Sequence, residues 1–360
     1  MLNALTIDVE DYFQVHAFSD AIKFENWGNY ECRIERNTDR LLSILSDSPI
    51  KNGSTAARQY GNTLIPQHSS TSALKNDSVP SPQHLVTHSL NNSFTQKVQG
   101  TFFVLGWIAE RYPGLVRRIQ KLGHEIACHG YAHRLIYTQS KEEFRQDIRK
   151  AKAILEDITG SEVTGYRAPS YSITNRSQWA FEVLVEEGFK YDSSIFPIRH
   201  DFYGMPDAPR FPFVISLNGA SNLEFSMLNC ELETAAQQHG NTAPHCSIIE
   251  FPISTVKVLG TNFPISGGGY FRLFPYPIIR RGLGSINEKE QKPFIFYIHP
   301  WEIDPNQPRI NGLSSRSKFR HYVNLNKTEF KFKKLLSDFE FSSIRELLGN
   351  NEQHSITATH

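Results

Sequence analysis

The sequence predicts an α/β protein built from strand–helix units on a parallel sheet, either open or closed into a barrel. Short apolar runs typical of buried strands alternate along the chain with amphipathic helical patterns that have capping residues at their ends. Unusual polar residues follow five of the predicted strands, and catalytic groups of such folds collect at the same strand ends. The 360 residues, 39% of them hydrophobic, are enough to form a sizeable core.

The predicted strands are short, apolar and spread over most of the chain. In chain order they cover residues 5–7, 101–105, 124–127, 163–166, 190–192 and 294–298.

Helices are predicted between these strands and near the C-terminus, over 37–45, 113–122, 141–159, 177–187 and 328–336. The first has Asn37 or Thr38 as its expected N-cap. The third opens with a capping box of Ser140 and Glu143 and closes at Gly160. Its apolar face consists of Phe144, Ile148, Ala151, Leu155 and Ile158. The last is followed by a short predicted strand.

Two stretches have no sustained period and are expected to be insertions. Residues 46–99 are dense in Ser, Asn, Thr, Gln and Pro, a composition with too little apolar surface to offset the cost of ordering. We expect a long mobile insertion there, and a second irregular insertion over 217–246.

Composition excludes several classes of protein. The 38 basic residues balance 37 acidic ones, which argues against a nucleic-acid binder. The sequence shows no apolar run of the roughly 18 residues that a membrane span needs, and no signal peptide is recognised at its start. Four cysteines lie far apart without a Cys-x-x-Cys pair, as in a reducing compartment. We expect a cytoplasmic enzyme without an integral membrane segment.

An acidic cluster follows the first predicted strand. Asp8, Glu10 and Asp11 place three carboxylates within four positions, so a cation must offset their repulsion if they are buried. A solvated acidic turn is the alternative.

Two histidines follow the strand at 124–127. His129 and His133, at i and i+4, can converge on one metal ion, although such pairs also occur by chance. Two imidazoles and one carboxylate are a common ligand set of open catalytic metal sites, which keep a position free for water.

Three further residues stand at later strand ends. Arg167 is suited to orienting a carboxylate base through a bidentate pair. Asp192 ends the predicted strand at 190–192, and His299 follows the one at 294–298. Each of the three, taken singly, is as well explained by a structural role.

The joint order of these motifs resembles the NodB-type polysaccharide deacetylases of carbohydrate esterase family 4. The resemblance rests on residues 123–126 (GHEI), 165–170 (GYRAPS) and 191–197 (YDSSIFP). It is closer to the subgroup associated with exopolysaccharide loci of the exosortase/PEP-CTERM type. That likeness rests on residues 8–15 (DVEDYFQV), 249–256 (IEFPISTV), 266–274 (SGGGYFRLF) and 319–323 (FRHYV).

The resemblance implies a distorted (β/α) barrel with fewer than eight regular strands, over residues 1–305, with a C-terminal extension at 306–360 packed on it. It also implies metal-dependent removal of N-acetyl groups from an amino-sugar polysaccharide or oligosaccharide, with zinc expected and cobalt or nickel also accepted. The roles carried over are Asp8 as general base, Arg167 as its orienting partner, His299 as general acid, Asp192 as the carboxylate that polarises His299, and His129 and His133 as metal ligands. A backbone N–H near Ser170 or Tyr171 is expected to stabilise the oxyanion.

The chain departs from the family pattern in its first motif. Val9 separates Asp8 from the next carboxylate, so the third metal ligand is either Glu10 or Asp11. A strand's period of two would place Asp8 and Glu10 on one face, which favours Glu10. Two other departures, Ser193 and Tyr297, are expected to change the walls near the acetyl group. The alternatives are an amidase acting on a small non-sugar amide and a catalytically silent carbohydrate-binding protein on the same fold.

Overall fold

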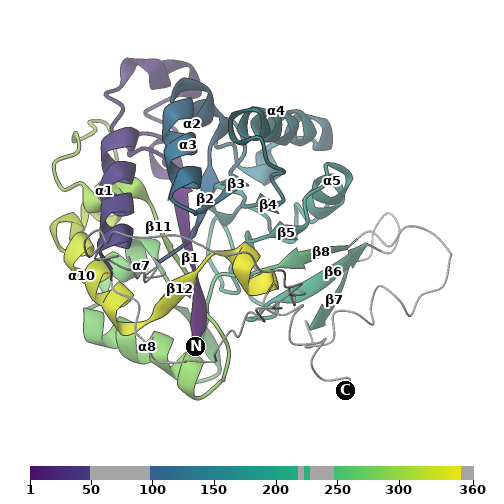
Figure 1. Cartoon of the computed structure of the whole chain (residues 1–360), viewed down its shortest axis with the longest axis vertical. Helices are drawn as coiled ribbons and strands as arrows, with labels where there is room; N and C mark the ends of the chain where they lie inside the picture. The colour runs from purple at the N-terminus through teal and green to yellow at the C-terminus, as the bar shows by residue number, and fades with distance from the viewer. Residues whose placement is uncertain (49–97, 218–222, 228–246, 350–360) are drawn as a thin grey trace, which may run out of the picture.

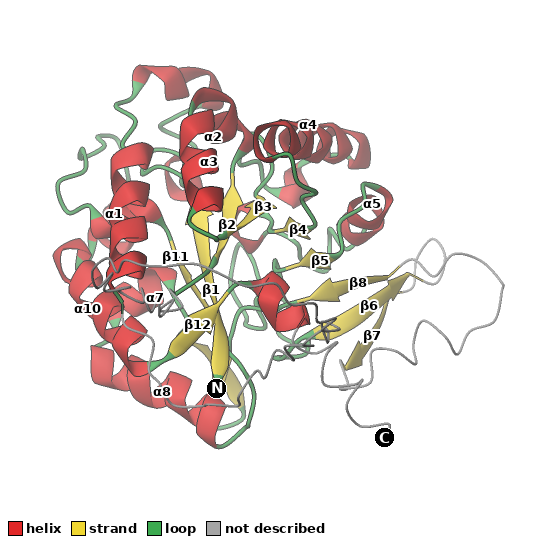
Figure 2. Cartoon of the chain, viewed as in Figure 1, coloured by secondary structure: helices red, strands yellow, loops and turns green. Residues whose placement is uncertain are grey.

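A computed structural model shows a central sheet surrounded by helices (Figures 1 and 2). It describes residues 1–48, 98–217, 223–227 and 247–349. The predicted insertion at 46–99 therefore lies almost wholly outside the described residues, as does most of the one predicted at 217–246.

The strands form a mixed, mostly parallel sheet in the order β11-β1-β2-β3-β4-β5-β8-β6-β7, and β12 also pairs with β1. The strands are β1 (Leu2–Val9), β2 (Thr101–Val104), β3 (Glu125–Cys128), β4 (Gly165–Tyr166), β5 (Tyr191–Asp192), β6 (Phe213–Leu217), β7 (Leu223–Met227), β8 (Ser247–Glu250), β11 (Ile295–Ile298) and β12 (Glu340–Ser342). A separate antiparallel hairpin consists of β9 (Thr255–Val258) and β10 (Thr261–Pro264).

The helices follow the order that strand–helix units require. They are α1 (Ile34–Asp47), α2 (Gly106–Arg111), α3 (Pro113–Lys121), α4 (Lys141–Thr159), α5 (Ala180–Glu186), α7 (Gly268–Leu273), α8 (Tyr276–Glu288), α9 (Ser315–Tyr322) and α10 (Leu325–Asp338). Short 3-10 turns are η1 (His16–Phe18), η2 (Phe24–Asn29), η3 (Ile136–Thr138), η4 (Pro169–Tyr171) and η5 (Pro300–Ile303).

The barrel closes through irregular backbone rather than through a regular ladder. Beyond β8, the amide of Ile253 donates to the carbonyl of Ile195, and Ser266 Oγ donates to the carbonyl of Ser254. The amide of Tyr297 in β11 then donates to the carbonyl of Ser266 at 2.9 Å. The predicted α/β fold with a distorted barrel is confirmed, and its carboxyl strand ends face one site.

Several local predictions are confirmed and others are wrong. Ser140 and Glu143 form the predicted capping box, and Gly160 ends α4 in the left-handed region. The predicted N-cap of α1 is wrong, because α1 begins three residues before Asn37 and both candidates are buried inside it. The predicted irregular insertion at 217–246 is also wrong in part, since it contains β7, which pairs with β6.

The residues beyond 305 pack on the barrel instead of standing apart. β12 adds to the first three residues of β1. Lys331 in α10 donates to three carbonyls at the end of α7, those of Phe271, Arg272 and Phe274. Within the part of the chain described, no helix combines the length and hydropathy that crossing a bilayer would take.

Candidate active site

The carboxyl ends of four parallel strands bring the predicted polar residues to one place. These residues are Asp8 and Glu10 at the end of β1, His129 after β3, Arg167 after β4 and His299 after β11. In the sheet, β1 lies next to β11, which leads to His299, and one strand away from β3, which leads to His129.

Glu10, His129 and His133 form a cluster that could hold a metal ion. One ligand atom from each residue lies within 4.8 Å of the others. Oε2 of Glu10 is buried and accepts no hydrogen bond of good geometry, although it lies 2.6 Å from Nε2 of His133. Nδ1 of His129 donates to the carbonyl of Arg167 at 2.7 Å, which leaves Nε2 with its lone pair free. Two imidazoles and one carboxylate with unused lone pairs fit a divalent metal such as zinc.

Burial and neighbouring charge set the protonation of this cluster. Burial lowers the pKa of His129 to about 4, which keeps the imidazole neutral and able to bind a metal. Burial alone would raise the pKa of Glu10, but the histidines around it outweigh burial and hold the pKa well below its ordinary value. The carboxylate is therefore ionised, as a metal ligand must be.

The loop that carries the two histidines is held by α4. Asp147 of α4 accepts from the amides of Tyr131 at 2.7 Å and Ala132 at 3.3 Å. Gly130 has φ +73°, and a Cβ at this position would lie 2.8 Å from Asp147 Oδ2. His133 itself has φ 52°, a region that non-glycine residues rarely adopt and that the surrounding hydrogen bonds must support.

Asp8 is held by a fully buried arginine. Arg167 Nη1 donates to Asp8 Oδ1 at 2.7 Å and to Thr6 Oγ1 at 2.8 Å. The ion pair of Arg167 and Asp8 is therefore monodentate, and not bidentate as predicted. Arg167 is itself fixed by Ser193, whose carbonyl and hydroxyl accept from Nε and Nη2. Ser193, which was predicted to change the walls near the acetyl group, is buried and supports the arginine.

His299 lies across Asp8 and Glu10. Its Nε2 is 3.8 Å from Asp8 Oδ2 and 3.5 Å from Glu10 Oε1, and its Nδ1 is 3.6 Å from Oε1 of Glu302. Burial would lower the pKa of His299, but the three carboxylates outweigh it and raise the pKa to about 9. The imidazole is therefore charged at neutral pH and carries a proton that it can donate.

The carboxylate predicted to polarise His299 is elsewhere. Asp192 accepts from the hydroxyl of Ser194 at 2.6 Å and contacts the protonated carboxyl of Glu250, and among the described contacts it has none with His299. Burial and the nearby charge of Asp192 raise the pKa of Glu250 well above its ordinary value, so the two carboxyls share a proton. The carboxylate that lies next to Nδ1 of His299 is that of Glu302, because η5 returns this side chain to the histidine.

Asp11 points away from the histidines. Its carboxylate accepts from the amides of Tyr12 and Arg33, and it anchors the loop before α1. Burial raises the pKa of Asp11 to about 6. The structure therefore groups Glu10, and not Asp11, with His129 and His133.

The two predicted oxyanion residues lie on η4, where both have φ near +53°. The amide of Tyr171 already donates to the carbonyl of Ala168 at 3.1 Å, so it is engaged within the turn. The buried hydroxyl of Tyr171 has no hydrogen-bond partner among the described residues, and its ring lies 5.1 Å from that of Tyr297. The available polar group of Tyr171 is thus its side chain.

Sequence reasoning missed Asp147, Glu302 and Arg272. Asp147 is a carboxylate beside the apolar face of α4, next to buried Ile148, and Glu302 follows His299 at the spacing of one helical turn. Those local signals could have indicated both residues. Arg272 carries no such signal, because its partner Glu302 is 30 residues away in the sequence.

Two family models match separate parts of this chain. The family described as polysaccharide deacetylase matches residues 67–187, and a domain of unknown function, DUF3473, matches residues 229–349. The second match crosses the boundary predicted at 305 and includes His299. Asp8 and Glu10 lie outside both matches.

Curated relatives match a part of the chain. A peptidoglycan deacetylase of Helicobacter pylori is 31% identical over 102 residues, which are 28% of this chain and 33% of that protein. A peptidoglycan-N-acetylglucosamine deacetylase of Bacillus cereus is 37% identical over 86 residues, 24% of this chain and 31% of that protein. The chain thus spans about a third of the length of these relatives.

A crystal structure of a Mycobacterium smegmatis protein of the polysaccharide deacetylase type superposes with a TM-score of 0.47 and 17% identity, over 98% of this chain and 90% of that one. The sequence matches, and not this superposition, carry the assignment. The chain thus carries a segment of the polysaccharide deacetylase family, a family of carbon–nitrogen hydrolases, followed by a DUF3473 domain.

Proposed function

We propose that this protein removes N-acetyl groups from an amino-sugar polysaccharide with the help of a divalent metal ion. The observation that carries the proposal is the position of Asp8 and His299 beside the cluster of Glu10, His129 and His133. A base, an acid and a set of metal ligands at one site are the groups that amide hydrolysis needs.

Glu10, His129 and His133 would hold the metal, with zinc as the best fit to two imidazoles and a carboxylate. When bound there, the metal would polarise the acetamide carbonyl and lower the pKa of the attacking water. Asp8, fixed by Arg167, takes the proton of that water. His299 gives its proton to the leaving nitrogen, so the products are acetate and a free amino sugar.

Two observations support a saccharide substrate. The relatives named above are deacetylases of peptidoglycan, and the polysaccharide deacetylase match of this chain includes His129, His133 and Arg167. Its first motif and three later segments resemble the exopolysaccharide subgroup, so we propose an exopolysaccharide as the polymer.

Release of acetate from oligomers of N-acetylglucosamine tests the proposal. We expect release by the purified protein, loss of release after chelation, and recovery on adding zinc. Asp8→Asn is the matched control, because it keeps the size of the side chain and removes its basicity. Release from small amides but not from oligomers would favour the amidase, and oligomer binding without release would favour the silent binding protein.

A further inference from the structure

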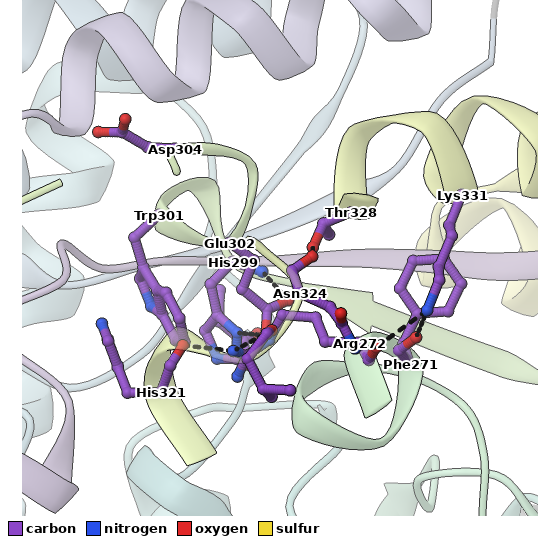
Figure 3. A network of polar contacts seen from close by, with 12 residues as sticks. Phe271, Arg272, His299, Trp301, Glu302, Asp304, His321, Asn324, Thr328 and Lys331 are labelled. Atoms are coloured by element: carbon purple, nitrogen blue, oxygen red, sulfur yellow. Dashed lines mark hydrogen bonds and ion pairs between the residues drawn. The ribbon is translucent and has the colours of Figure 1, made fainter. Parts of the chain in front are cut away.

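A buried carboxylate lies directly behind the proposed acid. The turn η5 begins one residue after His299, so the side chain of Glu302 folds back onto it (Figure 3). Glu302 is 0% exposed, and its Oε1 lies 3.6 Å from Nδ1 of His299. With Nδ1 turned toward Glu302, Nε2 is the ring nitrogen that faces Asp8 and Glu10.

Arg272 fixes the charge and position of Glu302. Its guanidinium is 3% exposed, and Nε lies 3.1 Å from the same Oε1 of Glu302. Burial would raise the pKa of Glu302, but Arg272 and His299 outweigh burial and hold the pKa below its ordinary value. Glu302 is therefore an ionised carboxylate between two cations, a buried arrangement that is costly unless every member is paired.

Residues 321–331, near the end of the DUF3473 match, hold Arg272 in turn. Nη1 donates to the backbone carbonyl of His321, and Asn324 and Lys331 donate to the carbonyl of Arg272 at 3.1 and 2.9 Å (Figure 3). These three partners come from the end of α9 to the middle of α10. Arg272 thus connects residues 321–331, to which we assign no catalytic group, to the proposed acid His299.

A stack of rings fixes the plane of the imidazole. Trp301 lies between His299 and His321, with centroids 5.3 and 4.2 Å away and ring planes 25° and 15° from parallel. Nε1 of Trp301 also donates to Oε1 of Glu10 at 3.3 Å. Stacking restricts tilting of the imidazole, whereas Glu302 determines which nitrogen faces the reacting atoms.

We propose that Glu302 is the positioning residue for His299 and that Arg272, held by residues 321–331 of the C-terminal domain, acts through Glu302. This inference rests on the proposed function. It gives residues 321–331 a part in catalysis: they complete the acid side of the site and are more than a brace for the fold.

A double-mutant cycle on Glu302 and Arg272 tests the proposal. Glu302→Gln should lower kcat roughly ten- to a hundredfold with KM and zinc content within about twofold of wild type. Arg272→Met should do the same, and the double variant should lose no more than the worse single variant, because Arg272 acts through Glu302. Arg272→Lys, which keeps a cation, should recover part of the loss.

Arg210→Met is the matched control. Arg210 is also clamped between a carboxylate, Glu290, and the carbonyl of Thr255, but it is not part of the network around His299. Its loss should lower the thermal unfolding temperature and leave the kcat of the folded, zinc-loaded protein unchanged. If Arg272→Met behaves like Arg210→Met, the arginine is a structural brace and the proposal is overturned. Additive losses in the double variant would overturn it too.

The imidazole NMR signals of His299 separate this proposal from the proposed function. Glu302→Gln and Arg272→Met should both shift the ¹⁵N resonances of the His299 ring, whereas Arg210→Met should not. If the wild-type protein releases no acetate but the two variants show these shifts, the proposed function is refuted and the positioning role of Glu302 is retained. Unshifted resonances in both variants would refute the positioning whatever the activity.

Discussion

Glu10 and Asp11 are adjacent acidic residues with opposite surroundings. β1 ends at Val9, and Asp8 and Glu10 continue its alternation toward the histidines. Asp11 faces the loop before α1, where two backbone amides bind its carboxylate. The period of a strand thus correctly predicted that Glu10, and not Asp11, lies with the two histidines, and the environment of Asp11 indicates a structural role.

Three substitutions separate these roles. Glu10→Ala should strip the metal, Asp8→Asn should keep it and lower kcat by roughly 10²- to 10⁴-fold, and Asp11→Ala should keep both metal and turnover. Asp11→Ala leaves two backbone amides without their acceptor and should cost about 1–3 kcal/mol of unfolding free energy. Metal titration and denaturant unfolding measure these effects. A zinc-loaded Glu10→Ala protein would refute the assignment.

His124 gives the protein a dependence of stability on pH. Its ring packs on Phe102, its Nδ1 has no hydrogen-bond partner among the described residues, and burial lowers its pKa from 6.5 to about 4. The unfolded state then binds the proton more readily. The stability from keeping His124 neutral is complete above pH 6.5 and is lost as pH falls through 6.5 toward 4.

Denaturant unfolding of metal-free wild type and His124→Gln over this pH range checks the expectation. The wild type should lose about 3 kcal/mol relative to the variant as pH falls from 6.5 to 4, since one pKa unit is worth about 1.4 kcal/mol. The difference between the two proteins removes the contribution of the other histidines. Parallel curves would show that His124 does not titrate with folding.

Among the elements, α4 links the helical layer to the metal site. Its N-terminus is fixed by the Ser140 capping box, and Asp147, two turns further on, holds the histidine loop. The capping box therefore stabilises the N-terminus of α4, and Asp147 holds the loop that carries His129 and His133. Substitutions at the two positions should have different consequences.

Asp147→Ala should weaken metal binding roughly 10- to 100-fold, the usual cost of losing a group that orients ligands. Ser140→Ala is the control: it should cost about 1 kcal/mol of unfolding free energy and leave metal affinity unchanged. Competition with a chromogenic chelator measures affinity in both variants. Equal affinity in the two variants would show that the loop keeps its shape without Asp147.

The sequence was informative where the structure depends on neighbours along the chain. Capping residues and apolar periods predicted α4 and the buried strands, and the motif order predicted Asp8, His129, His133, Arg167 and His299 at one site. The failed prediction for Asp192 shows the limit. Whether a buried carboxylate turns to His299 or to Ser194 and Glu250 depends on long-range packing, which neither period nor motif order contains.

The C-terminal third is part of the barrel at the level of the whole molecule. β12 pairs with β1, and the amides of Ile344 and Arg345 donate to Thr101 and Glu125 at the amino ends of β2 and β3. The same third supplies Arg272 and His299 at the opposite, carboxyl ends. Removing it would therefore remove both core and site, so its role must be tested by point substitution.

Residues 49–97, outside the described part of the chain, should by contrast be dispensable. Their composition cannot support a core of their own, and each doubling of loop length changes the closure cost by only about 0.6 kcal/mol. Joining Ser48 to Val98 by a short glycine–serine linker should leave the unfolding temperature and acetate release close to wild type. Insoluble protein would show that the segment packs on the barrel.

Metal binding should stabilise the whole fold, because its ligands come from β1 and from the loop after β3. At a free zinc concentration 100 times the dissociation constant, binding contributes about 2.7 kcal/mol. For a protein of this size the unfolding temperature should then rise by roughly 3–5 °C. His129→Ala should abolish the rise, since the remaining two ligands hold zinc weakly, whereas His299→Gln should retain it.

Differential scanning calorimetry with and without zinc measures all three proteins. A rise of the same size in His129→Ala would place the stabilising metal elsewhere, and a lost rise in His299→Gln would make that histidine a ligand and not the acid.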